Sequence, residues 1–304
     1  MKKVMVLWIL TALLITACGS ASPTPQVATP TPQATSTLEP TQVPTEAPPP
    51  TATPAPTTTP LPIITPSPAD HTICARGCDF TTIQSAIDSV SVASGAIIEV
   101  TDPIHTEAGI IVSKDVTIRG LGADITIVQA HETLEESPER VFSVPEGVTV
   151  IIENLTIRHG RPSNEKEHGG GVENYGNLTF KNCIITNNSA RGGGGVSSRT
   201  GSLTVIACTI SDNVARGDGP RGEECGGGGG LKCSSGTMTV LNSTITGNQA
   251  GIKAEGLGGG IRTGCACTAE ILNTTVSGNS AVRYGGGVAA GDHDDAGLLP
   301  RPPG

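Results

Sequence analysis

The segment Ile185-Thr-Asn-Asn188-Ser-Ala190, followed by Gly193-Gly-Gly-Val196, decides the fold because the chain repeats it three more times. Each copy has an aliphatic residue, an asparagine three positions later, a small residue, and then a triple glycine with an aliphatic residue. The further copies are Ile210-Ser-Asp-Asn213-Val-Ala215 with Gly228-Gly-Gly-Leu231, Ile245-Thr-Gly-Asn248-Gln-Ala250 with Gly258-Gly-Gly-Ile261, and Val276-Ser-Gly-Asn279-Ser-Ala281 with Gly285-Gly-Gly-Val288. Self-similarity at a period of about 20–50 residues is typical of a solenoid, whose sites are built from residues stacked on adjacent coils.

Alternation of side chains around each copy predicts which residues point into the solenoid. The reference positions are Asn154, Asn182, Ala207, Asn242 and Asn273. The inward residues before them are Val150 and Ile152, Leu178 and Phe180, Leu203 and Val205, Met238 and Val240, and Ala269 and Ile271. The inward residues after them are Ile157, Ile185, Ile210, Ile245 and Val276, and the asparagines Asn188, Asn213, Asn248 and Asn279 form a third column. We expect these stacked amides to hydrogen-bond at the strand spacing of about 4.8 Å.

A short helix is expected before the repeats. Thr82 is suited to be its N-cap, and Ile83, Ala86, Ile87 and Val90 follow at helical spacing. Strand-like runs then occupy 96–100, 110–112, 116–118, 125–128 and 148–157. A helix in this place is predicted to cap the open end of the solenoid, which would otherwise expose backbone edge and core.

These features resemble the right-handed parallel β-helix of the pectin-lyase-like superfamily over residues 71–290. The repeats are most similar to those of polymorphic outer-membrane proteins, with Ile or Val in place of their Phe. The resemblance implies an all-β, single-stranded right-handed parallel β-helix with a short N-terminal capping helix. It also implies that an enzyme of this kind would cleave polysaccharides, with Ca²⁺ as cofactor only if it were a lyase; we expect no other cofactor.

The N-terminus, residues 1–18, resembles a bacterial lipoprotein signal. Lys2 and Lys3 precede an apolar stretch over 4–14 that is short for a membrane span, and Ile15-Thr16-Ala17-Cys18 resembles a lipobox. The resemblance implies that Cys18 is the lipid attachment site. We therefore expect an extracytoplasmic protein anchored to a bacterial membrane or cell surface.

Residues 19–70 are predicted to be a disordered linker. Most of the 23 prolines of the chain lie there among Thr, Ala and Gln, a composition that favours extended polyproline II and a reach of about 150 Å. The net charge of −9 and the lack of a basic patch in the sequence argue against a nucleic-acid partner. Residues 291–304 follow the last repeat without its pattern, and we expect an irregular tail there, with the last coil either truncated or capped by another molecule.

The outward positions contain mostly Thr and Ser. The rows 156, 184, 209, 244, 275 and 158, 186, 211, 246, 277 hold hydroxyls except at Ile184 and Arg158. No three carboxylates stack on these rows or on the outward rows 151, 179, 204, 239, 270 and 153, 181, 206, 241, 272. Because glycosidic cleavage by acid–base catalysis needs two placed carboxylates, no catalytic residue and no metal ligand is predicted. Two features are predicted to form a contact surface, for a partner or for self-association: the apolar column Ile206, Leu241 and Leu272, and the pair Arg158 and His159, which faces the loop 160–168.

Eight cysteines remain besides Cys18, an even number that favours disulfides outside the cytoplasm. Cys74 and Cys78 flank a short turn and are expected to bond. Cys183 and Cys208 occupy the same inward position on adjacent coils, where they either stack as thiols or bond. Cys233 is expected to bond Cys265 or Cys267, and of the two we predict Cys265. The spacing of the cysteines from Cys225 to Cys267 matches no common zinc pattern.

The first functional hypothesis is a surface-anchored, non-catalytic β-helix that binds extracellular glycan, the cell envelope or a protein, as an adhesin does. The alternative is a pectate-lyase-like polysaccharide lyase or glycoside hydrolase with a site built from loops. The two differ in one feature: an enzyme should bring outward Asp, Glu, Arg or Lys side chains together on one face.

Overall fold

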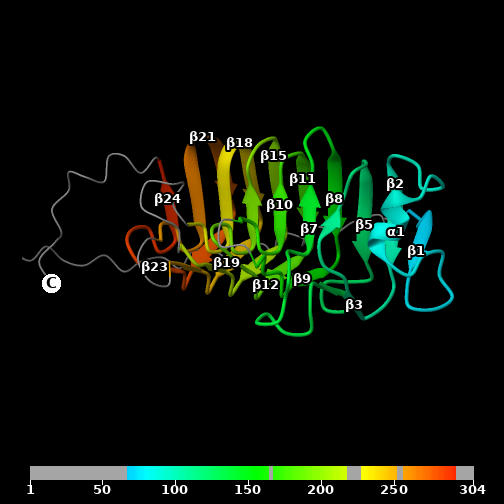
Figure 1. Ribbon diagram of the computed structural model, residues 1–304. Coiled ribbons are helices and arrows are strands. Elements are labelled where there is room, and N and C mark those ends of the chain that lie inside the picture. Colours follow the sequence, from blue (N-terminus) through cyan, green and yellow to red (C-terminus); the bar gives the residue numbers. More distant parts are fainter. Residues whose placement is uncertain (1–66, 164–166, 218–226, 252–255, 292–304) are drawn as a thin grey trace, which may run out of the picture. The chain divides into compact units, whose positions relative to one another are not determined.

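The computed structural model describes residues 67–163, 167–217, 227–251 and 256–291. The predicted lipoprotein signal with Cys18, most of the linker and the tail after Gly291 lie outside these residues. The described chain is a stack of coils whose strands follow one another from β1 to β24 along the solenoid (Figure 1). Every strand pairing within it is parallel, which confirms the predicted all-β parallel β-helix.

The coils that start at residues 96, 116 and 149 pass through three strand positions and the later coils through four; the first and the last position belong to one large sheet. The first branch of that sheet holds the strand that begins each coil: β1 (His71–Ile73), β2 (Ala96–Val100), β5 (Val116–Gly120), β8 (Thr149–Glu153), β11 (Asn177–Lys181) and β15 (Ser202–Ile206). The second branch holds the strand that ends each coil, before the corner that leads to the next coil: β4 (Ile110–Ile111), β7 (Phe142–Val144), β10 (Val172–Asn174), β14 (Val196–Ser198) and β24 (Val288–Ala290). The long strands β18 (Leu231–Leu241) and β21 (Ile261–Leu272) run around the corner and so join the branches.

Two further sheets complete the coil. The second sheet contains β3 (Ile104–Thr106), β6 (Ile127–Gln129), β9 (Thr156–Arg158), β12 (Ile184–Thr186), β16 (Thr209–Ser211), β19 (Thr244–Thr246) and β22 (Thr275–Ser277). The third sheet contains the short strands β13 (Ser189–Ala190), β17 (Val214–Ala215), β20 (Gln249–Ala250) and β23 (Ser280–Ala281). Equivalent residues lie opposite each other across the coils, as Ile185 and Ile210 do.

The core is a continuous column of aliphatic side chains, as the alternation predicted. The predicted inward residues of the coils from β8 to β19 are buried, and Phe180 is the largest among them. In the last coil Ala269 is exposed and Ile271 and Val276 are half-buried, because few of the described residues cover that coil. The aliphatic residue after each triple glycine begins a strand of the second branch.

The asparagines of the repeat form the predicted inward ladder. The Nδ2 atom of Asn188 donates to Oδ1 of Asn213 at 3.0 Å, and that of Asn213 donates to Oδ1 of Asn248 at 3.0 Å. Asn248 continues the ladder to Asn279 at 2.9 Å. Each Oδ1 also accepts the backbone N–H of the preceding rung, as in the 3.1 Å bond from Asn188 to Asn213. The buried amides are therefore satisfied by their own repeats.

The triple glycines are explained by the turn and by the neighbouring coil. Gly193 has a φ of 62°, in the left-handed region that favours glycine. A Cβ on the next residue, Gly194, would lie 2.6 Å from the carbonyl oxygen of Gly229 on the adjacent coil. The first glycine thus makes the turn, and the second allows the close backbone contact between coils.

The helix α1 (Ile83–Asp88) lies at the first coils, as predicted, and Thr82 caps it by accepting the N–H of Ser85 at 3.1 Å. The Glu107 carboxylate also accepts the N–H of Ile83 at 2.7 Å, and it bonds Nε2 of His105 at 2.8 Å. The prediction was wrong about Val90, which lies after the helix and is fully exposed. Because the helix ends at Asp88, the helical spacing no longer applies at this residue.

Candidate functional site

The outward positions of the second branch carry a column of charged and polar side chains that the sequence analysis did not consider. Glu173 on β10, Ser197 on β14, Lys232 on β18 and Arg262 on β21 lie opposite one another in register. Their strand neighbours Val172, Val196, Leu231 and Ile261 point inward and are fully buried. Alternation along each strand therefore points these four side chains away from the core, where surrounding residues bury Ser197, Lys232 and Arg262 and leave Glu173 half-buried.

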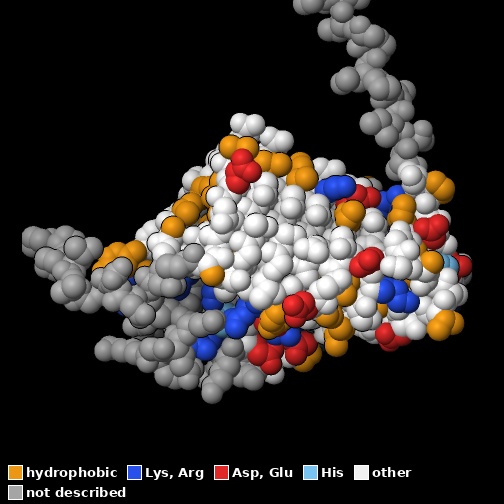
Figure 2. Space-filling model, turned by 90° about the horizontal axis from the view of Figure 1, so that it is seen from above, with side chains coloured by type: hydrophobic (Ala, Val, Ile, Leu, Met, Phe, Trp, Pro, Cys, Tyr) orange, Lys and Arg blue, Asp and Glu red, His pale blue; other side chains and the backbone are white. Residues whose placement is uncertain are grey.

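Loops from neighbouring coils add further charges, and together these residues form what we call the charged cluster. Its acidic half lies around β7 and β10, and its basic half around β14 and β18. Figure 2 shows acidic side chains next to a run of basic side chains along the lower edge of the view, beside a broad uncharged surface. The members are Glu139, Arg140, Glu167, Glu173 and Tyr175 in the acidic half, His168, Arg191, Arg199, Lys232 and Arg262 in the basic half, and Ser197 between them.

Arg140 organises the acidic half. Its guanidinium lies 2.6 Å from Oε2 of Glu167, 3.3 Å from Oε2 of Glu173 and 3.5 Å from Oε1 of Glu139. Its Nε atom is buried and makes no hydrogen bond. Three carboxylates thus share one guanidinium, which leaves this half with a net negative charge.

Glu173 is the most perturbed carboxyl group of the cluster. Burial raises its pKa, although Arg140 acts in the opposite direction. Tyr175 donates its hydroxyl to Oε1 of Glu173 at 3.1 Å, and burial together with the Glu173 charge raises the pKa of Tyr175. A carboxyl group with a raised pKa beside a second carboxylate, Glu167, has the chemistry of an acid–base pair.

His168 lies in the basic half and stays neutral. Burial first, and then the charges of Lys232, Arg199 and Arg191, lower its pKa to about 2. The Nζ atom of Lys232 lies 3.4 Å from Nδ1 of His168, and because an ammonium group has no acceptor, Nδ1 must be the acceptor. Lys232 is thus the cation that the structure places against the imidazole of His168.

Ser197 lies between the two halves. It is fully buried, and its Oγ atom makes no hydrogen bond. A buried hydroxyl without a partner costs free energy, so such a group calls for a specific explanation. Its in-register neighbours are Glu173 on one side and Lys232 on the other.

The predicted contact residues lie elsewhere. Arg158 donates from Nε to Oε1 of Gln129 at 2.9 Å, on the second sheet. His159 occupies a left-handed turn with a φ of 59°, and Nδ1 lies 3.1 Å from the carbonyl oxygen of His131. Asn187 has the same conformation one coil further on, so His159 takes the turn position of the repeat.

The predicted apolar column lies on the outer face of the first branch. Ile206, Leu241 and Leu272 are opposite one another; the first two are half-buried and Leu272 is 48% exposed. The same column begins with alternating charges at Glu99, Arg119, Glu153 and Lys181. The structure therefore places the column and the pair Arg158 and His159 on different sheets, and brings neither to the charged cluster.

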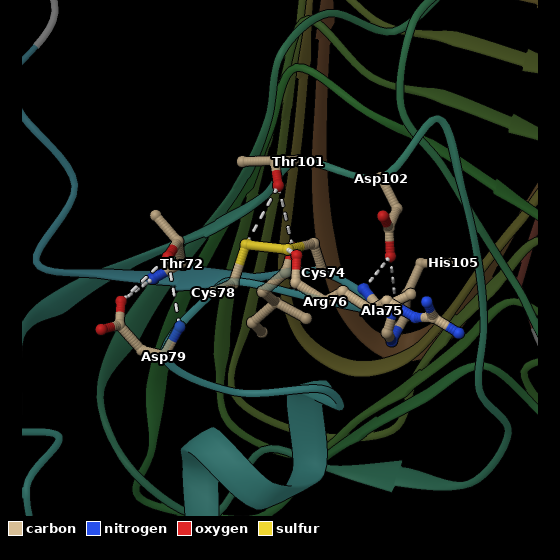
Figure 3. The surroundings of a disulfide bond; sticks show 10 residues. Thr72, Cys74, Ala75, Arg76, Cys78, Asp79, Thr101, Asp102 and His105 are labelled. Carbon is tan, nitrogen blue, oxygen red and sulfur yellow. Dashed lines mark hydrogen bonds and ion pairs between the residues drawn. A yellow bond between two sulfur atoms is a disulfide. The ribbon is translucent and has the colours of Figure 1, made fainter.

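The disulfide between Cys74 and Cys78 forms as predicted, with the Cα atoms 5.5 Å apart. Figure 3 shows it beside Thr101, whose Oγ1 lies 3.6 Å from Sγ of Cys78. Thr72 donates its backbone N–H and its hydroxyl to Asp79 nearby, and these bonds lower the pKa of Asp79. The bond closes the turn that leads from β1 to α1.

Cys233 bonds Cys267 rather than the selected partner Cys265. Cys233 lies opposite Thr263, but the ladder shifts by one residue between Cys233 and Ser235, so that Cys267 comes opposite Gly236. Because the long strands turn a corner there, the Cα atoms of Cys233 and Cys267 are 6.0 Å apart. This bulge is a tertiary feature that the cysteine spacing did not reveal.

Among the described residues, no group of three or more His, Cys, Asp and Glu residues is arranged to hold a metal ion. In the same part of the chain, no helix is both long and apolar enough to cross a membrane.

Stacked coils whose equivalent strands pair in parallel define the class of parallel β-helix proteins. The family described as the right-handed beta helix region matches residues 114–297, more than half of the chain. The protein therefore belongs to the right-handed β-helix family.

Solved structures with a similar course of the backbone include a pectin methylesterase from carrot. It is 10% identical, with a TM-score of 0.35, and the match covers 76% of this chain and 91% of that chain. Another is Escherichia coli YbhC, which is 15% identical with a TM-score of 0.38, over 79% of this chain and 76% of that chain. No curated protein sequence matches this chain.

Proposed function

We propose that the protein is a surface-anchored β-helix that binds an anionic extracellular polymer, such as a uronate-containing glycan, at the charged cluster without cleaving it. The observation that carries this proposal is the position of Lys232, whose Nζ atom lies 3.4 Å from Nδ1 of the neutral His168. Adjacent coils repeat the charged position along the solenoid, as Lys232 and Arg262 do. A polymer with a regular spacing of anionic groups suits such a column.

Binding without cleavage is favoured by the state of the carboxylates. Glu167 and Glu173 both contact the guanidinium of Arg140, so each is held in an ion pair. A general base must instead be able to reach a proton of the substrate. The acidic half then orients Arg140 and limits where an anionic polymer can lie.

Anchoring at the cell surface is part of this proposal and rests on the sequence around Cys18. The disulfides Cys74–Cys78 and Cys233–Cys267 fit an oxidising compartment outside the cytoplasm. Metabolic labelling with a radioactive fatty acid tests the anchor: the wild type should be labelled, and Cys18→Ser should not. Labelling of the serine variant would contradict the lipid attachment site.

The binding experiment uses the purified protein on immobilised polygalacturonate, alginate, a sulfated glycan and neutral dextran. We expect retention on an anionic glycan that weakens steeply with salt, no retention on dextran, and loss of most retention in Lys232→Ala. Lys181→Ala is the matched control, since it removes one lysine from the outer face of the first branch. Equal binding by Lys232→Ala and the wild type would refute the cluster as the binding site.

Catalysis is the second candidate, and the raised pKa of Glu173 beside Glu167 favours it. In this case Glu173 is the proton donor, and Tyr175 and Arg140 position it. Depolymerisation of the same anionic glycans is measured with and without Ca²⁺, by reducing ends and by the absorbance of unsaturated products. Cleavage that is lost in Glu173→Gln would establish this candidate in place of simple binding.

A further inference from the structure

Cys183 and Cys208 are free thiols on adjacent coils. The residues two positions before them, Lys181 and Ile206, pair in register across the first branch. The residues after them, Ile184 and Thr209, pair in register across the second sheet. The two cysteines therefore lie one above the other at the corner between these sheets.

The contacts bring the two sulfur atoms into one hydrogen-bonded column. The backbone N–H of Cys183 donates to Sγ of Cys208 at 3.4 Å. On the next coil the N–H of Cys208 donates to Oγ of Ser243 at 3.1 Å, so a hydroxyl takes the same role there. The side chains of Cys183 and Cys208 are 1% and 2% exposed. Serine hydroxyls would accept these backbone N–H groups equally well, yet two positions of this corner hold thiols.

We propose that Cys183 and Cys208 form an additional disulfide between adjacent coils when a small oxidant of the peroxide class reaches them. Neighbouring strands lie about 4.8 Å apart, within the range of about 4.4–6.8 Å between the Cα atoms of a disulfide. The protein already joins two adjacent coils in this way at Cys233 and Cys267. The corner thus holds the parts of a second such link in reduced form.

The reaction begins at Cys208. Hydrogen bonds from the side chain and the backbone of Cys183 lower the pKa of Cys208, whereas burial raises the pKa of Cys183, so Cys208 forms the thiolate more readily. It attacks one oxygen of hydrogen peroxide and becomes a sulfenic acid, and the released hydroxide takes up the proton that Cys208 lost to form water. The sulfur of Cys183 then attacks the Cys208 sulfur, the S–O bond breaks, and the departing hydroxyl with the Cys183 proton leaves as a second water. Two thiols and one peroxide thus give one disulfide and two waters.

The place of the pair in the fold supports access by a small molecule. Ala207, the residue directly before Cys208, is exposed at the corner. Cys208 itself is 2% exposed beside this surface residue, which excludes an enzyme's active site and leaves access only to a small molecule such as hydrogen peroxide. The resulting bond would close a loop of 25 residues in sequence separation and restrict the unfolded chain.

The test treats the purified full-length protein with hydrogen peroxide, alkylates the remaining thiols under denaturing conditions and maps peptides by mass spectrometry. We expect a cross-linked peptide pair containing Cys183 and Cys208 that dithiothreitol separates. We also expect an increase in Tm of roughly 5–10 °C relative to the untreated protein. The cross-link and the increase should both be absent in Cys183→Ser and in Cys208→Ser, and serine fits this position because Ser243 occupies it on the next coil.

Two results would overturn the proposal. One is alkylation of both cysteines after peroxide treatment at the same yield as before it. The other is oxidation of Cys208 to a sulfinic acid without any cross-link to Cys183. The serine variants are first checked for a circular dichroism spectrum like that of the wild type. Either Cys208→Ser or Cys183→Ser can serve as the folded control.

Discussion

Replacement of Asn213 by alanine is expected to be among the most damaging single changes to the β-helix. Asn213 is fully buried in the middle of the asparagine ladder. Its Oδ1 accepts the backbone N–H of Asn188 at 3.1 Å, and its Nδ2 donates to the carbonyl oxygen of Ile185 at 2.8 Å. Asn213→Ala leaves both backbone groups without this partner in a site that water does not reach.

The magnitude follows from these two groups and from the space left behind. Each buried group that loses its partner costs about 1–3 kcal/mol, and the removed side chain adds a cavity. We therefore expect a loss of about 3–5 kcal/mol in the free energy of unfolding. The matched control is Asn279→Ala, which removes the same ladder bonds from a half-buried position in the last described coil. Because water replaces the lost partners there, its cost is expected to be about 1 kcal/mol.

The assay is equilibrium unfolding in urea, followed by circular dichroism and by hydrogen exchange. Agreement of the two transitions is required before free energies are compared, since stacked repeats do not always unfold in one step. A loss below about 1 kcal/mol for Asn213→Ala, or an equal loss for Asn279→Ala, would refute the reasoning that buried amides sustain the stack.

Three further changes test other parts of the structure. Ala207 has a φ of 52° where the preceding coil has Asn182, and asparagine adopts this left-handed conformation at a lower cost than alanine. Ala207→Asn should therefore stabilise the protein by about 0.5–1 kcal/mol in urea unfolding. An unchanged midpoint would contradict this reasoning. Cys233→Ser or Cys267→Ser should lower the Tm by several degrees, because the disulfide between coils is lost; the same Tm in wild type and variants would show that the bond adds no stability. Burial raises the pKa of Glu173 above its usual 4.5 in the folded state, so ionisation of this group opposes folding. The protonated carboxyl group therefore stabilises the fold at low pH, and this stability is lost as the pH rises through the folded pKa. Thermal unfolding should therefore show that the stability of Glu173→Gln relative to wild type increases from pH 4 to pH 7, and a difference that does not change with pH would contradict the raised pKa.

Much of the fold could be predicted because each repeat carries the same local instructions. The aliphatic and asparagine columns were derived from side-chain alternation alone, and the structure confirms both the buried Phe180 and the hydrogen bonds of Asn213. The helix cap at Thr82 was equally local. Val90 shows the limit, since helical spacing carries no information about where the helix ends.

The charged cluster was missed for two physical reasons. Its column lies on strands of the second branch, which follow the glycine runs. The outward rows described from the sequence belong to other strands, those of the first branch and of the second sheet. Its other members come from loops of unequal length, as Arg140 and Glu167 do, although their side chains form an ion pair across 27 residues. A comparison of the residues next to each glycine run would have found Glu173, Ser197, Lys232 and Arg262, but not their loop partners.

The sequence by itself determined the solenoid, its inside and outside, and the residues of each internal column. It did so because the backbone alternates side chains strictly and because each coil repeats the pattern of the one before it. Only the tertiary structure decided which charges meet, which cysteine bonds Cys233, and that Cys183 and Cys208 remain neighbouring thiols. These outcomes depend on loop lengths, on a bulge and on the corner between two sheets, where residues distant in sequence are brought together without any periodic signal.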